Sequence, residues 1–286
     1  MADAAAEAVA EVEAVPVAVA GAEALAGSEA VAGAETDARA EALARAGADP
    51  DRRSFLDLHC HSCYSFDSIS RPADIVRAAA SRGLTHLAIT DHDVIEGALR
   101  ALDLAPVGLT VIVGEEILTR EGDCLGLFLE RAVPPGLSLA ETIAAIHEQG
   151  GLAGLPHPFD QLRRSSGLAR GREELLAPVL PQLDFIEAFN ARVVNPSANE
   201  RAAELAVRHG LPGVASSDAH HVSEVAVACT IVPGPAGTPA GLKDALSGGT
   251  LLTGRASYYL RGLTWAVKIA KRARGVRRIP PATSIE

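Results

Sequence analysis

The feature that most constrains the fold is a regular alternation of short apolar runs and helix-like stretches, which begins at Phe55. The apolar runs have the length of strands, and the stretches between them have the spacing of amphipathic helices. Strands are expected over residues 55–59, 84–90, 110–113, 124–129, 151–155, 183–188, 212–216 and 249–253, and helices over 72–82, 138–149, 171–178, 197–209 and 239–247. Strands that alternate with helices are typical of the α/β class, in which helices cover a parallel sheet.

Seven or eight such units within about 200 residues favour a closed βα barrel over an open sheet. Ser138 and Glu141 have the spacing of a capping box at a helix start, and Gly83, Gly150 and Gly210 lie where helices should stop. In such a barrel, the chemistry gathers at the C-terminal ends of the strands. The sequence therefore predicts an α/β barrel of about seven strands with its site at those ends.

Histidines and acidic residues follow the predicted strands directly, on the side where a barrel gathers its chemistry. His59 and His61 close the first strand and face the same way, because side chains alternate along a strand. The other candidates at strand ends or in the loops after them are His92, His157, His220, Asp67, Glu116 and Asp218. Imidazoles and carboxylates bind divalent metals, and buried ionisable groups need partners. This pattern predicts a multinuclear metal site.

Five ordered segments resemble the PHP family, the polymerase and histidinol phosphatase superfamily of metal-dependent phosphoesterases. They are DLHCHSCYSFDS at 57–68, LTHLAITDHDVIEG at 84–97, GEEI at 114–117, PHP at 156–158 and SDAH at 217–220. The resemblance spans residues 55 to about 255, and among the members it favours the stand-alone nucleoside-bisphosphate phosphatases and exonuclease-like proteins. It implies a distorted βα barrel of seven strands with up to three metal ions.

The resemblance also implies which residues hold these ions. One ion is expected on His59, His61, Glu116 and Asp218, a second on Asp67, His92 and His220, and a third on Glu116 and His157. Asp123 stands where many members have a histidine. Its carboxylate suits a hard cation, so the third site either persists with a changed preference or is weak or empty. We expect two or three divalent ions, of Mn²⁺, Zn²⁺, Fe²⁺ or Mg²⁺.

Three residues are the candidates for catalysis. A group of divalent ions lowers the pKa of a water molecule and binds phosphoryl oxygens. Arg192, after the sixth strand, could bind the remaining phosphoryl charge in a bidentate manner, although a surface Arg192 paired with a neighbouring acid is an equal interpretation. The resemblance places His157 and Asp218 near the leaving group without fixing which one is the general acid.

Composition divides the chain into three parts. Residues 1–50 contain 21 Ala, ten acidic residues and two basic ones, so we expect a low-complexity, disordered tail. Residues 51–256 form the expected PHP-like barrel. Residues 257–286 form a basic amphipathic extension, with seven Lys and Arg between positions 261 and 279. This extension is expected either to pack on the barrel or to attract nucleic acid or anionic lipid.

The charge balance bears on the partners of the chain. A net charge of −10 argues against a stable complex with nucleic acid held by charge alone. The expected partner is a small phosphorylated substrate, including a nucleotide or a short oligonucleotide. Four cysteines do not suggest a disulfide framework in 286 residues, and no unbroken apolar run suits a transmembrane helix. A cytoplasmic location is therefore expected.

These observations predict a metal-dependent phosphoesterase that hydrolyses phosphomonoester or phosphodiester bonds. A metal-dependent amidohydrolase is an alternative, because that class also builds on a His-x-His strand. It usually needs a bridging lysine, however, and the only lysines are Lys243, Lys268 and Lys271, all away from the predicted strand ends. The other alternative is a regulatory or binding protein that kept the barrel with weak or no turnover, an idea that only Asp123 supports.

Overall fold

A computed structural model describes residues 53–162, 176–276 and 278. The predicted tail over residues 1–50 and most of the helix expected over 171–178 lie outside these residues. The strands are β1 (Arg53–Asp57), β2 (His86–Ile89), β3 (Thr110–Leu118), β4 (Asp123–Leu127), β5 (Leu152–Leu155), β6 (Phe185–Asn190), β7 (Gly213–Ser216), β8 (Cys229–Pro233) and β9 (Thr250–Leu252). The α-helices are α2 (Pro72–Ser81), α3 (Glu96–Leu102), α4 (Leu139–Glu148), α6 (Pro196–His209), α7 (Pro239–Leu246) and α8 (Tyr258–Ala273), with single 3-10 turns η1 (Leu180–Gln182) and η2 (Val222–Glu224).

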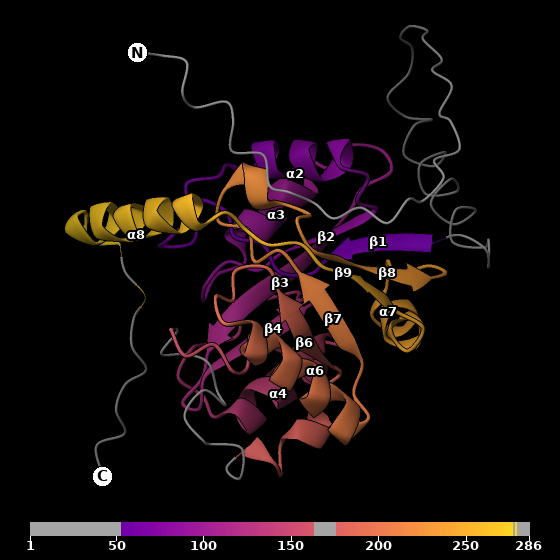
Figure 1. The fold of residues 1–286 in the computed structure, drawn as a ribbon. Helices are drawn as coiled ribbons and strands as arrows, with labels where there is room; N and C mark the ends of the chain where they lie inside the picture. The colour runs from indigo at the N-terminus through magenta and orange to yellow at the C-terminus, as the bar shows by residue number, and fades with distance from the viewer. Residues whose placement is uncertain (1–52, 163–175, 277, 279–286) are drawn as a thin grey trace, which may run out of the picture.

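The strands form one mixed sheet in the order β7-β6-β5-β4-β3-β2-β1-β8-β9. The pairs β1–β2, β2–β3, β5–β6 and β6–β7 are parallel, and the pairs that involve β4 or β8 are antiparallel. Helices lie outside the sheet, and α8 extends to one side of it (Figure 1). Among the residues that the structure describes, none of the helices combines the length and apolar character needed to span a bilayer.

The sheet closes into a distorted barrel where β7 meets β1 and β8. The Thr230 hydroxyl on β8 accepts from the Ala215 N–H of β7 at 2.8 Å and donates to the Ala215 carbonyl at 3.0 Å. Beyond the end of β1, the His61 N–H donates to the Ala219 carbonyl at 2.8 Å. These contacts bring the C-terminal ends of β1 and β7 together, so the predicted α/β barrel with its site at those ends is confirmed.

Within the described residues, the barrel has nine strands of mixed direction where about seven parallel strands were predicted. The turn between β3 and β4 has only four residues, 119–122, and a parallel crossover needs a dozen or more. Therefore β4 pairs antiparallel with β3, held at the turn by the Thr119 N–H, which donates to the Gly122 carbonyl at 2.9 Å. Strand β8, which was not predicted, lies in an uncharged segment that contains several prolines and glycines, and it pairs antiparallel with both β1 and β9.

Helix α3 was also missed, because Gly97 in its first turn looks like a helix breaker. A Cβ at Gly97 would lie 1.9 Å from Asp91 Oδ2 and 2.3 Å from Ser62 Oγ, so only glycine fits there. The predicted capping box is confirmed: Ser138 accepts from the Glu141 N–H, and the Glu141 carboxylate accepts from the Ser138 N–H. Gly83, Gly150 and Gly210 end their helices with positive φ angles, as expected.

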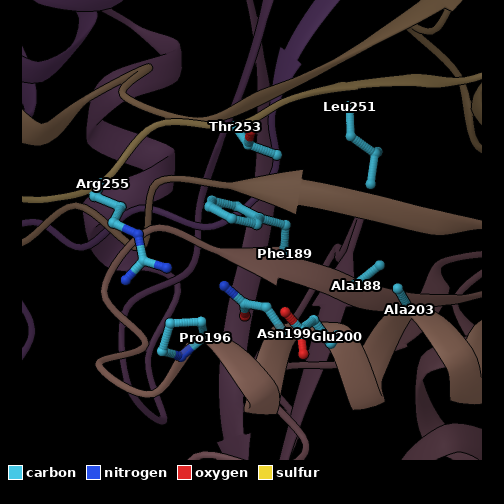
Figure 2. A pocket seen from close by; sticks show the side chains of 9 residues that line it. All are labelled: Ala188, Phe189, Pro196, Asn199, Glu200, Ala203, Leu251, Thr253 and Arg255. Carbon is cyan, nitrogen blue, oxygen red and sulfur yellow. The ribbon is translucent and has the colours of Figure 1, made fainter. Parts of the chain in front are cut away.

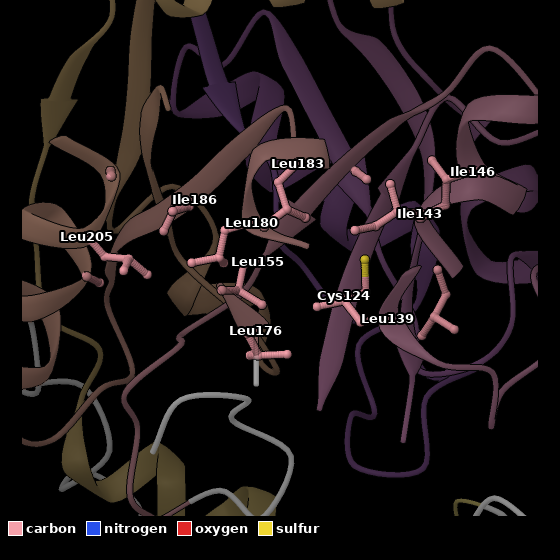
Figure 3. Packing of buried hydrophobic residues seen from close by; sticks show 14 of the residues in the cluster. Cys124, Leu139, Ile143, Ile146, Leu155, Leu176, Leu180, Leu183, Ile186 and Leu205 are labelled. Atoms are coloured by element: carbon pink, nitrogen blue, oxygen red, sulfur yellow. The ribbon is translucent and has the colours of Figure 1, made fainter. Parts of the chain in front are cut away.

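Apolar side chains fill both sides of the sheet. Between the sheet and the outer helices, Leu155 and Ile186 pack with Ile143 of α4 and Leu205 of α6 (Figure 3). On the other side of the sheet, Phe185 lies so close to β5 that a Cβ at Gly154 would be 2.2 Å from its ring. The barrel is therefore a packed body rather than a pore.

Asp184, just before β6, ties three elements together on the side of the barrel away from the polar cluster. Its Oδ2 accepts from the Ala153 N–H of β5 and contacts His147 Nε2 of α4, each at 2.8 Å, and its Oδ1 accepts from Lys243 of α7 at 2.7 Å. Burial raises the pKa of Asp184, but the bonds from Lys243, Ala153 and His147 outweigh burial and lower it below its ordinary value.

We predict that Asp184→Ala lowers the free energy of unfolding by about 1–3 kcal/mol, because the Ala153 N–H loses its buried acceptor. Urea denaturation measures this difference, with Asp244→Ala on the exposed face of α7 as the matched control. Since the folded pKa of Asp184 is lowered, its contribution is complete above the unfolded pKa, about 3.9. The difference from wild type should shrink as the pH falls below that value; a constant difference would contradict the assignment.

Candidate metal centre

The polar residues at the strand ends converge on the carboxylate of Glu116, which is fully buried on β3. Glu116 Oε1 lies 3.0 Å from His157 Nε2, and Oε2 lies 3.4 Å from His59 Nε2 and 3.3 Å from His61 Nε2. His92 Nδ1 lies 3.1 Å from the same Oε2. One carboxylate thus contacts imidazoles that follow β1, β2 and β5.

Among the described residues, donor atoms gather in three groups, each with ligand atoms within 4.8 Å of one another. The groups are His61, Asp67, His92 and His220; His59, His61 and Asp218; and His59, Glu116 and His157. His59 and His61 each belong to two groups, and their Nε2 atoms lie 3.1 Å apart. These shared, buried donors are consistent with a polynuclear metal site.

Asp67 contacts the histidines that follow β2 and β7. Its Oδ2 lies 3.0 Å from His220 Nε2 and 3.3 Å from His92 Nε2. Its other oxygen, Oδ1, is buried and has no hydrogen-bond partner among the described residues. A buried carboxylate oxygen without a donor is costly unless a cation satisfies it. Asp67 therefore fits a position beside a metal ion.

The electrostatics of the site also fit divalent cations. Burial disfavours the imidazolium form and lowers the pKa of His92 to about 4 and of His220 to about 3, so both rings are neutral, the form that binds metals. Burial acts in the same direction on His61, but its hydrogen bonds to Asp218 and Glu116 outweigh burial and raise its pKa to about 9. The carboxylates around His61 thus favour positive charge at this point.

One carboxylate and one amide that belong to none of the three donor groups orient the candidate metal ligands. Glu187 on β6 contacts His59 Nδ1 at 3.0 Å through Oε1, and its Oε2 accepts from the His157 N–H at 2.7 Å. The Asn190 amide donates to Glu187 Oε2 at 2.9 Å and to Asp218 Oδ2 at 3.0 Å. Such contacts fix the ring orientation and raise the basicity of the bound imidazole.

The loop after β1 has its own support. Asp91 accepts from the Ser62 N–H at 2.6 Å and from the Ser62 hydroxyl at 2.5 Å, in the space that Gly97 leaves open.

The neighbour of Glu116 on β3, Glu115, points to the opposite face and accepts from the Val133 N–H at 2.8 Å. Glu116 rather than Glu115 therefore points into the cluster; the sequence left these two neighbours ambiguous, and only the family resemblance favoured Glu116.

Two of the predicted residues carry positive φ angles, 26° at His157 and 52° at Asp218. Non-glycine residues adopt this region only where the surroundings enforce it. His157 is held by the Glu187 contact to its N–H, and Asp218 by the Asn190 amide. Both side chains consequently turn back over the strand ends and face the donor groups.

The structure places Asp123 and Arg192 differently from the other predicted residues. Asp123 belongs to none of the three donor groups found among the described residues, and its Oδ1 lies 2.7 Å from Arg278 Nη1. Arg192 is buried, donates to Glu224 Oε1 at 2.5 Å and to Thr264 Oγ1 at 3.0 Å, and borders the mouth of the site. The roles predicted for these two residues stay predictions.

A cavity of about 310 Å³ borders one of the donor groups. Asp67, His92 and His220 line part of its wall, and side chains of α8 together with Arg278 line another part. Reasoning from sequence did not find that wall. Its only signal was the spacing of Arg261, Trp265 and Lys268 within the basic C-terminal stretch, which did not say what the helix would face.

Figure 2 shows a second cavity of about 300 Å³ between β6, α6 and the segment around β9. Phe189, Leu251 and Ala203 give it an apolar lining, and Asn199 and Arg255 lie at its sides. None of its lining residues belongs to the three donor groups found among the described residues. This cavity is separate from the candidate metal centre.

Comparison with known proteins agrees with this geometry. Residues 57–176 match the PHP domain, and residues 196–251 match a PHP-associated segment. An uncharacterised protein of Methanocaldococcus jannaschii is 38% identical over 146 residues, which cover 47% of this chain and 81% of that protein. The error-prone DNA polymerase of Cutibacterium acnes is 31% identical over 218 residues, which cover 62% of this chain but only 19% of the polymerase.

Solved structures share the fold. A two-domain protein of Bacteroides vulgatus, described as containing a predicted PHP-like metal-dependent phosphoesterase, superimposes with a TM-score of 0.57 at 21% identity. The match covers 72% of this chain and 66% of that one. Together with the matched segments and the donor groups at the strand ends, these similarities show that the chain belongs to the PHP domain family.

Proposed function

We propose that this chain is a metal-dependent phosphoesterase that hydrolyses a phosphomonoester or phosphodiester bond of a small phosphorylated metabolite, a nucleotide or an oligonucleotide end. The observation that carries the proposal is the convergence of three groups of buried donor atoms at the strand ends of a PHP-type barrel. Each group combines imidazole nitrogens with carboxylate oxygens, a donor set that suits Mn²⁺, Zn²⁺ or Fe²⁺.

The three groups suggest how two or three ions would be held. His59, His61 and Asp218 would hold one ion, His61, Asp67, His92 and His220 a second, and His59, Glu116 and His157 a third. When bound, divalent ions supply Lewis-acid chemistry, which acidifies water and neutralises the charge of a phosphoryl group. The protein residues around them would orient the substrate and move protons.

His157, Asp218 and Arg192 are the proposed catalytic residues. His157 and Asp218 belong to adjoining donor groups, and whichever of the two does not hold an ion during the reaction could deliver a proton to a leaving-group oxygen. Arg192 borders the same cavity, and its contacts to Glu224 and Thr264 hold the guanidinium in a fixed orientation. A fixed guanidinium suits bidentate binding of phosphoryl oxygens.

The amidohydrolase alternative receives no support from the lysines. Lys243 lies on α7 and bonds Asp184, and Lys271 lies on α8 and donates to the Cys63 carbonyl at 2.7 Å. Lys268, also on α8, reaches Asp67 from outside the barrel. None of the three extends from a strand, as a bridging lysine would. A regulatory protein without turnover is the alternative that an activity assay excludes or supports.

The first prediction from this site concerns activity. Protein stripped of metal and reloaded with Mn²⁺, Zn²⁺, Fe²⁺ or Mg²⁺ should release phosphate from members of a phosphoester panel. His59→Ala and Asp218→Ala should lower kcat/KM by about 100-fold or more, because even residues that only orient metal ligands cost about 10–100-fold. Absence of turnover with every metal, in protein that binds metal, would support the regulatory alternative.

A second prediction concerns Glu187, which orients His59 without belonging to a donor group. Glu187→Gln keeps the shape but removes the negative charge, and should weaken metal affinity by about 10-fold or more. Isothermal calorimetry of metal binding measures the effect independently of turnover. Glu204→Gln, on the exposed face of α6, is the matched control and should bind metal like the wild type.

A third prediction tests whether Asp123 is a metal ligand. Because Arg278 already pairs with this carboxylate, we expect Asp123→Ala to keep the metal content of the wild type. Elemental analysis of the purified protein gives the number of ions per chain. Loss of one ion per chain would instead establish Asp123 as a metal ligand and contradict this expectation.

A further inference from the structure

Only one side of helix α8 packs on the barrel. Thr264 and Val267 on this side are buried, and Leu260 is half-buried. Thr264 accepts from Arg192 at 3.0 Å, and Lys271 donates to two carbonyls of the loop after β1. Leu260, Thr264, Val267 and Lys271 follow one another at intervals of four, three and four residues, the spacing of one helix face. The barrel therefore holds α8 by a single face.

The opposite side of α8 is apolar and faces solvent. Its large side chains are exposed, at 86% for Tyr259, 68% for Trp265 and 48% for Ile269. The other exposed apolar residues on this side are Leu263, Ala266, Ala270 and Ala273. An amphipathic helix of a globular domain normally turns its apolar side to the core. Here that side points outward on a helix that extends beyond the sheet (Figure 1), and an exposed apolar surface of this kind is typical of an interaction site.

Basic residues border this apolar surface, and acidic residues are absent from it. From Tyr258 to Arg278 the sequence contains no Asp or Glu. Arg272 follows Trp265 by seven residues and Arg274 follows Leu263 by eleven, so the two exposed arginines lie at opposite edges of the apolar surface. An apolar face with aromatic residues, flanked by basic ones, is the pattern of a helix that lies in the plane of a membrane surface.

We propose that the outward face of α8 docks on an anionic lipid membrane surface, with Tyr259, Trp265 and Ile269 among the headgroups and the two arginines against anionic lipids. Tyr and Trp suit this depth because each joins an apolar ring to a polar O–H or N–H. The net charge of −10 opposes docking only weakly, because charges elsewhere on the chain are screened beyond about 8 Å at physiological ionic strength. Trp265 also lines the cavity beside the metal centre, so docking would bring this cavity to the membrane surface.

The composition of the face favours lipid over two other partners. Nucleic acid would use the arginines, but its phosphate backbone offers nothing to the aliphatic side chains of Leu263 and Ile269. A second copy of α8 would cover those side chains, but it would bring Arg272 and Arg274 near like charges with no acidic residue of the helix to pair them. An anionic membrane surface satisfies both the apolar and the basic groups.

The test titrates the 286-residue chain with vesicles of phosphatidylcholine alone or mixed with phosphatidylserine. Trp265 is the single tryptophan, so its emission reports directly on the outward face. We expect a blue shift with the mixed vesicles that exceeds the shift with phosphatidylcholine alone. Ile269→Gln should weaken binding to the mixed vesicles by about 10-fold, the loss of one buried aliphatic side chain. Arg272→Gln and Arg274→Gln should each weaken it by about 5-fold.

Val207→Gln is the matched control for Ile269→Gln, because Val207 is an exposed aliphatic residue of α6. Arg131→Gln, at an exposed position before α4, is the control for the arginines. Both controls should bind the mixed vesicles like the wild type.

An absent blue shift with mixed vesicles, unchanged binding by Ile269→Gln, or equal losses in the controls would each overturn the proposal. A blue shift that appears only with a short DNA duplex, or only as the protein concentration rises, would also overturn it and assign the face to nucleic acid or to a second copy. None of these measurements depends on hydrolysis, so membrane docking and the proposed function can fail separately.

Discussion

The buried carboxylate of Glu116 is the interaction on which the rest of the structure depends. Its two oxygens contact four imidazoles that follow three different strands, so a single anion fixes the relative positions of the ends of β1, β2, β3 and β5. In a low-dielectric interior, these groups are tolerable only together, because an isolated buried charge costs far more than a paired one. The convergence of donors is thus a condition for burying them at all, and it also leaves a place that favours a cation.

The surrounding polar groups show how the chain maintains this arrangement. Glu187 contacts both His59 and the backbone of His157, and Asn190 links Glu187 to Asp218. These contacts also hold His157 and Asp218 at positive φ angles, which neither residue would adopt without support. The two strained positions are those whose side chains are proposed to move protons. Strain at this edge of the barrel is offset by a connected set of hydrogen bonds rather than by any single one.

The parts of the site that depend on local periodicity could be predicted from sequence. His59 and His61 face the same way because strand side chains alternate. The choice between Glu115 and Glu116 was ambiguous by one residue, and only the family resemblance favoured Glu116. The parts that depend on partners distant in sequence could not. Strand β8 exists because β1 offers it an edge, and Gly97 sits inside α3 because Asp91 and Ser62 occupy the space of its missing side chain. The amphipathic pattern of α8 predicted a helix, but only tertiary contacts through Lys271 and Thr264 decide that it covers the metal centre.

The charged groups at the site are of two kinds, those that attract cations and those that could bind an anion. The barrel contributes carboxylates and imidazoles, which attract cations, and the groups around the cavity that could bind an anion are Arg192 after β6, Arg261 and Lys268 on α8, and Arg278 beyond it. A phosphoester needs both kinds of group, so an overall charge of −10 is compatible with an anionic substrate if the cations lie at the mouth of the site.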